Sequence, residues 1–94
     1  MVVGSLRMEL HLPASHSLKA KRSVVNHVKE RLRTRFNASV AEVDHQDLWQ
    51  RGALAIVTVS TDQAHADREL AAAADEIERV EPGLITRTEV EFLT

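Results

Sequence analysis

A run of basic residues between positions 19 and 35 is the feature of this sequence that most directly suggests chemistry. Phosphate binding needs cations at spacings that follow a nucleic-acid backbone, and each neutralised phosphate makes the affinity salt dependent. On a helix, Arg22, Lys29 and Arg33 recur at spacings of seven and four and form one row beside an apolar stripe. The predicted nucleic-acid-binding set is this row and its neighbours: Lys19, Lys21, Arg22, Lys29, Arg31, Arg33 and Arg35.

The charge of the chain is divided unevenly along its 94 residues. Residues 1–36 carry eight Lys and Arg against two Glu, a net charge of +6, whereas residues 37–94 carry four against twelve Asp and Glu, a net charge of −8. A basic half suits an anionic partner, or the acidic face of another copy. The alternative is that these long side chains lay their stems over the edge of the core and keep their charges in water.

Trp49, the single Trp of the chain, suggests a second surface because it stands in a polar segment. Flanked by Asp47 and Arg51, it could anchor a partner or stack on a base. The more common outcome for such a Trp is to fold back, pin its own loop over the core and satisfy its indole N–H locally. The sequence favours this second interpretation and leaves the first open.

The open face of a sheet is the remaining candidate surface. Arg7, Glu9 and His11 alternate there with no Phe or Tyr among them, which argues against the base stacking of RRM domains. An apolar centre with charges toward the edges suits sheet-to-sheet pairing of two copies. The alternative is a half-exposed sheet with cross-strand ion pairs, such as Arg7 with a Glu of the last strand. The predicted partner-binding residues are Trp49, Arg51, Arg7 and His11.

Patterns for catalysis and metal binding are weak. The five His residues lack the i, i+4 pairing and the HExxH spacing of a zinc site, and the absence of Cys excludes thiolate ligands and nucleophiles. Three Gly cannot form a Gly-rich phosphate loop. Asp44, His45 and Asp47 could form a carboxylate–imidazole pair, although such neighbours in a polar loop are ordinarily solvated. We therefore expect no enzyme, no metal site and no cofactor.

Six regular elements are expected to position these residues. Period-two alternation of apolar and polar residues predicts strands, and apolar residues at spacings of three and four predict helices. Within the first helix the inward stripe is Leu18, Val25, Val28, Leu32 and Phe36, with Ser15 or Ser17 as its cap. The predicted strands cover residues 2–12, 38–44, 53–60 and 84–93, and the predicted helices cover residues 17–36 and 63–80.

The order β-α-β-β-α-β is that of the ferredoxin-like α+β plait. It predicts an antiparallel four-stranded sheet in the order 4-1-3-2 with two helices on one face, in a single domain over residues 1–94. The termini and the connection 45–52 are the expected mobile parts. No apolar run approaches the ~20 residues of a membrane span, and the N-terminus has no basic leader, so we expect a cytoplasmic protein without a membrane partner.

Two stretches of the sequence resemble a known family. They are Ser17–Arg22 with the following Phe36 and Asn37, and the segment Val40–Arg51. Together they resemble the YlxP-like family of small bacterial proteins, domain of unknown function 503, over essentially the whole chain. The resemblance implies a ferredoxin-like fold, no established enzymatic activity, and genes that often lie among those for translation initiation and ribosome maturation.

The basic residues and the resemblance together favour a noncatalytic module that binds RNA or a ribosomal particle through its first helix. The alternative is a homo-oligomeric protein-interaction module that uses the open sheet face and the Trp49 loop, with a second copy of the chain as its partner.

Overall fold

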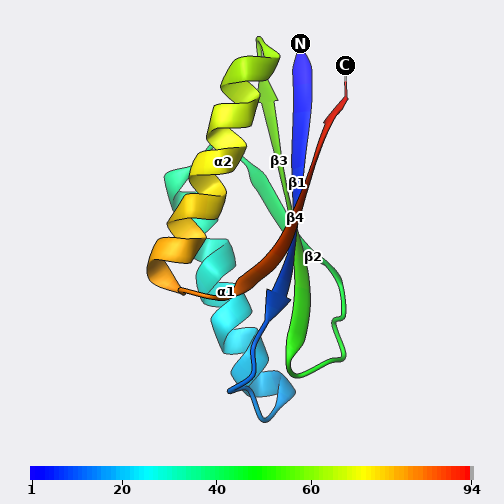
Figure 1. The fold of residues 1–94 in the computed structure, drawn as a ribbon, viewed down its shortest axis with the longest axis vertical. Coiled ribbons are helices and arrows are strands. Elements are labelled where there is room, and N and C mark those ends of the chain that lie inside the picture. Colours follow the sequence, from blue (N-terminus) through cyan, green and yellow to red (C-terminus); the bar gives the residue numbers. More distant parts are fainter. Residues whose placement is uncertain (94) are drawn as a thin grey trace.

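The computed structural model describes residues 1–93, and within them helices cover one face of an antiparallel sheet (Figure 1). The sheet of this described part has four strands in the order β2-β3-β1-β4, which confirms the predicted order and the central position of the first and third strands. The elements are β1 (Val2–His11), α1 (Leu18–Arg35), β2 (Ser39–Asp44), β3 (Arg51–Ser60), α2 (Gln63–Val80) and β4 (Ile85–Leu93).

The core lies between the sheet and α1 and α2. Leu6, Met8 and Leu10 alternate along β1 on the covered face and are at most 3% exposed, as the period of two predicts. Across the β1–β3 ladder Leu6 stands opposite Ile56, which is also buried. Buried Ala66 and Ala73 allow α2 to approach the sheet closely because their side chains are short.

The ends of α1 follow from local chemistry. Ser17 is the N-cap, and its Oγ accepts a hydrogen bond from the backbone N–H of Ala20 at 3.0 Å. At the other end Phe36 is the C-cap, and its N–H donates to the carbonyl of Leu32. Of the predicted alternatives for the cap, the structure therefore selects Ser17 over Ser15.

The segment between β2 and β3 is shorter than predicted. The β1–β3 ladder extends through Leu10 opposite Gly52 and His11 opposite Arg51, so β3 begins two residues before the expected position. The connection is therefore residues 45–50. A bulge between Glu42 and Asp44 shifts the register of β2 and places Asp44 opposite Ala53, on the open face of the sheet.

Candidate functional site

Lys21 is the member of the predicted basic set that the structure places differently. It is 0% exposed, and its Nζ donates to the carbonyl oxygens of His45 at 2.7 Å and Gln46 at 3.4 Å. The same ammonium pairs with Glu42 Oε2 at 2.7 Å. The prediction that Lys21 faces phosphate is wrong because this position lies on the inward stripe of α1, four residues before Val25 and seven before Val28. The spacing of Lys21 from Val25 and Val28 already indicates a buried position. The positive charge of Lys21 favoured the opposite interpretation, an exposed position.

One edge of α1 carries cations that point away from the core. Arg22 and Arg33 are exposed and Lys29 is half-buried, and within residues 1–93 none of them makes a salt bridge. Arg33 Nη2 donates to the Val40 carbonyl at 3.0 Å, which places this edge beside the edge strand β2. We call it the α1 basic edge, and it consists of Lys19, Arg22, Lys29 and Arg33.

The opposite edge of α1 faces α2, where Glu76 pairs with both of its Arg residues. Arg31 Nε lies 2.8 Å and Arg35 Nε 3.5 Å from Glu76 Oε1. Hydrogen bonds from Arg31 and then from Arg79 lower the pKa of Glu76 below its ordinary value. Arg31 and Arg35 belong to the predicted set, and the structure directs them toward a carboxylate of their own chain.

The connection 45–50 is held at both ends by side chains from distant parts of the sequence. Lys21 binds the carbonyls at its start, as described above. At its end Gln50 Nε2 donates to the carbonyls of Pro13 at 3.3 Å and Ser15 at 3.4 Å, while the Gln50 carbonyl accepts from Leu12 N. His45 has a φ of 60°, in the left-handed region, which turns the chain out of β2.

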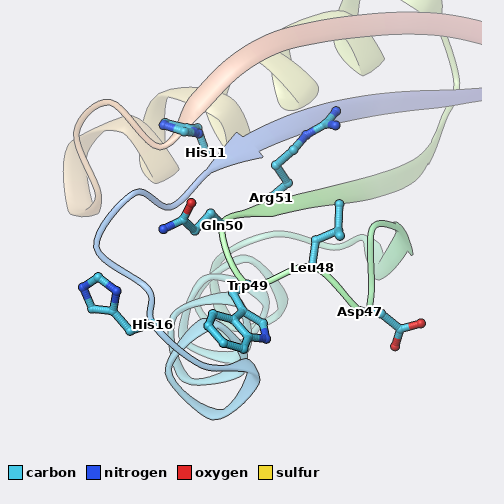
Figure 2. A pocket seen from close by; sticks show the side chains of 7 residues that line it. All are labelled: His11, His16, Asp47, Leu48, Trp49, Gln50 and Arg51. Carbon is cyan, nitrogen blue, oxygen red and sulfur yellow. The ribbon is translucent and has the colours of Figure 1, made fainter.

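Trp49 stands on this connection and remains 53% exposed, so the expectation that it folds back over the core is wrong. Within residues 1–93 its indole N–H donates no hydrogen bond. The ring borders a hollow of about 680 Å³ between the connection and the end of β1 (Figure 2). The other residues that line the hollow are His11, His16, Asp47, Leu48, Gln50 and Arg51.

The open sheet face carries a polar cluster that includes Arg7. Arg7 Nη2 lies 3.3 Å from Glu9 Oε1 and 3.4 Å from Asp44 Oδ2. The alternative in which Arg7 pairs with a Glu of the last strand is wrong, because the β2 bulge brings Asp44 onto this face and Glu89 pairs with Arg87 instead. The hydrogen bond that Arg7 donates to Glu9 raises the pKa of Arg7, and the bond from the backbone N–H of His45 lowers the pKa of Asp44.

The imidazole of His45 joins this cluster. Its Nε2 lies 3.4 Å from Glu9 Oε2 and 3.3 Å from Arg51 Nη2, and its Nδ1 lies 3.7 Å from Asp44 Oδ1. Sequence reasoning placed His45 with Asp44 and Asp47 and missed Glu9, which comes from β1. In the described part of the chain, His, Asp and Glu form no group of three or more suited to a metal ion, and no helix is long and apolar enough to span a membrane.

Comparison with known proteins identifies the family of this chain. The family model DUF503, described as a protein of unknown function, matches residues 3–90. The chain belongs to the DUF503 family. One relative is the uncharacterised protein YlxP of Bacillus subtilis (strain 168), which is 34% identical over 94 residues that cover 94% of this chain and 98% of YlxP. The resemblance to the YlxP-like family is thereby confirmed.

Solved structures similar to this DUF503 chain include designed proteins. The designed protein Foldit4 aligns with a TM-score of 0.54 and 16% identity over 99% of this chain and 96% of its own. A second design, Ferredog-Diesel, aligns with a TM-score of 0.54 and 11% identity over 95% and 83%. At such identities the likeness shows the fold alone, and it agrees with the predicted ferredoxin-like plait.

Proposed function

We propose that this protein is a noncatalytic binding module for structured RNA, free or in a ribosomal particle, and that it binds through the α1 basic edge. The observation that carries the proposal is that Lys19, Arg22 and Lys29 lie on one edge without a salt bridge in the described residues. Cations left without carboxylate partners are the groups that can neutralise phosphates. The proposal presupposes a cytoplasmic protein and needs no cofactor.

The shape of the α1 basic edge also supports the proposal. At about 1.5 Å of rise per residue, Arg22 and Arg33 are about 16 Å apart along the helix axis, so the edge can meet several consecutive phosphates. Glu76 of α2 lies at the other edge of α1, where it pairs with Arg31 and Arg35. A polyanion that approaches α1 from the β2 side therefore meets the basic edge before it meets Glu76.

The test measures binding of the purified full chain to a structured RNA and to ribosomal particles over a salt series. The double variant Arg22→Glu, Lys29→Glu is expected to weaken binding and to reduce the slope of log K against log salt by about 0.7–0.9 for each phosphate that the protein no longer neutralises. Arg33 stays unchanged because it also holds the β2 edge. The matched control Arg68→Glu, Arg87→Glu changes the net charge equally at exposed positions outside α1.

Equal losses of affinity in the two double variants would show that only net charge matters and would remove the α1 basic edge from the proposal. Absence of binding at low salt would remove RNA altogether. A retained slope in the Arg22→Glu, Lys29→Glu variant, with normal folding by circular dichroism, would place the phosphate-binding surface elsewhere.

A second candidate function, self-association through the open sheet face, is favoured by one row of apolar residues. Val3 of β1 stands opposite Val59 of β3 and Leu93 of β4, and the latter two are 60% and 57% exposed. Such a row suits a second copy of the same face. Sedimentation at micromolar concentration tests this self-association. We expect the unsubstituted protein to be a dimer and Val59→Lys to be a monomer. A monomeric unsubstituted protein would contradict self-association.

A further inference from the structure

The hollow beside Trp49 has two features that RNA binding by the α1 basic edge does not explain, an exposed aromatic ring and a volume that suits a small ligand. Trp is among the largest side chains and is highly buried on average, so a ring that is 53% exposed calls for a physical reason. The hollow beside it, of about 680 Å³, falls within the roughly 300–1,000 Å³ typical of small-ligand sites. Its walls combine one flat aromatic ring with hydrogen-bonding side chains.

The loop that carries Trp49 is hydrogen-bonded at both ends to side chains and carbonyls from distant parts of the sequence. Lys21 holds the carbonyls of His45 and Gln46, and Gln50 holds the segment before α1 through the carbonyls of Pro13 and Ser15. A ring held in place before binding loses less conformational entropy when a ligand stacks on it. The loop therefore presents Trp49 ready for contact.

The polar residues around the hollow identify the chemistry of the ligand. Figure 2 shows His11 and Arg51 at the strand ends and His16 on the segment that leads into α1, and it shows Arg51 and Asp47 extending away from the Trp49 ring. Arg51 Nη2 lies 3.3 Å from His45 Nε2, so the polar groups stand at the margin of the hollow and not against the ring. An exposed aromatic face with N–H donors and a carboxylate at its margin suits a stacked nucleobase whose polar atoms and phosphate reach outward.

The hollow lies next to the start of α1, because His16 is one of its lining residues. His16 immediately precedes the N-cap Ser17, and Lys19 and Arg22 lie in the first turns that follow. Lys21, between those two residues, contacts the Trp49 loop directly. A strand whose phosphates follow the basic edge toward the N-terminus of α1 therefore arrives at the hollow.

We propose that the hollow binds one unpaired nucleobase, stacked on Trp49, next to the phosphates held by the α1 basic edge. The inference rests on the proposed RNA function and adds a preference for RNA with a bulged or terminal unpaired base over a continuous duplex. Base stacking on an aromatic side chain contributes an affinity factor of about five to 150 per base.

The experiment uses the fluorescence of Trp49, the single Trp of a chain that has no Tyr. The full chain is titrated with a hairpin that carries one unpaired adenosine bulge, with the same hairpin carrying an abasic bulge, and with the continuous duplex. The adenosine bulge is expected to quench the fluorescence and to bind about tenfold more tightly than the abasic bulge. Trp49→Ala, followed by fluorescence anisotropy of labelled RNA, should equalise the two hairpins, while Trp49→Phe should retain most of the difference.

The outcomes separate this inference from the function on which it rests. Equal, salt-dependent binding of all three RNAs without quenching would overturn the base site and leave the α1 basic edge standing. Failure of every RNA to bind would overturn both. Quenching that follows protein concentration instead of RNA would assign the hollow to a second copy and overturn the base site.

Discussion

The two edges of α1 carry similar cations and differ in the neighbours they meet. On the α2 side, Arg31 and Arg35 converge on Glu76 and lie in an internal ion-pair network. On the β2 side, Arg22 and Lys29 make no salt bridge within residues 1–93. The number of basic residues on a helix therefore does not define a binding surface, because a neighbouring element can already neutralise some of those residues.

Between these edges lies Lys21, and its replacement is expected to have the largest effect. Lys21→Met leaves the Glu42 carboxylate, 18% exposed, without its cation and releases the carbonyls of the 45–50 connection. Removing one partner of a buried ion pair costs about 3–5 kcal/mol, which we expect as a lower free energy of unfolding in urea. The control Lys19→Met, at an exposed position, should change it by about 0.5 kcal/mol or less. Comparable stability of both variants would contradict an anchoring role for Lys21.

The edges themselves can be compared by reversing two charges on each. Arg22→Glu, Lys29→Glu should reduce RNA affinity at least tenfold at moderate salt, a change of about 1.4 kcal/mol, with little change in the urea midpoint. Arg31→Glu, Arg35→Glu should instead lower the urea midpoint of unfolding, because three carboxylates then face one another. This variant should keep most of the slope of log K for RNA binding against log salt. An identical loss of affinity in both variants would erase the distinction between the edges.

Acid titration should reveal the internal network on the α2 side. Because its pKa is lowered in the folded protein, Glu76 contributes stability fully above the ordinary carboxyl pKa of about 4.3, and this contribution is lost as the pH falls through the lower folded value. Glu76→Gln should therefore flatten the fall in unfolding free energy below about pH 4.5. Glu30→Gln, an exposed position on α1, serves as control. If the free energy of unfolding of Glu76→Gln falls with pH as steeply as that of the unsubstituted protein, the pairing of Glu76 adds no pH-dependent stability.

Trp49→Ala should lower the free energy of unfolding only slightly, in contrast to Lys21→Met. A half-exposed Trp on an anchored connection contributes about 1 kcal/mol, far less than the roughly 3–5 kcal/mol of a fully buried aromatic residue. Urea unfolding followed by circular dichroism measures the difference. A destabilisation as large as that of Lys21→Met would mean that the ring supports the core, and the hollow would lose its status as a candidate site.

Local periodicity determined most of the architecture. The alternation of Leu6, Met8 and Leu10 and the helical spacing of Val25, Val28 and Leu32 indicate which faces are buried, and the element order indicates the ferredoxin-like plait. These features were predictable because each depends on residues within one strand or helix. The ends of the elements moved by one or two residues, most clearly where the ladder of β1 extends β3 to Arg51.

The order of the elements, their inward faces and the presence of a basic first helix thus follow from local sequence patterns. Which basic residues remain available for binding depends on the folded structure, because the partners of Lys21, Arg31 and Arg35 come from β2, the 45–50 connection and α2. The exposure of Trp49 likewise depends on the folded structure, since Lys21 and Gln50 hold its loop from distant positions. Periodicity describes the face of one element, whereas charge pairing and loop placement depend on side chains that meet only after the chain has folded.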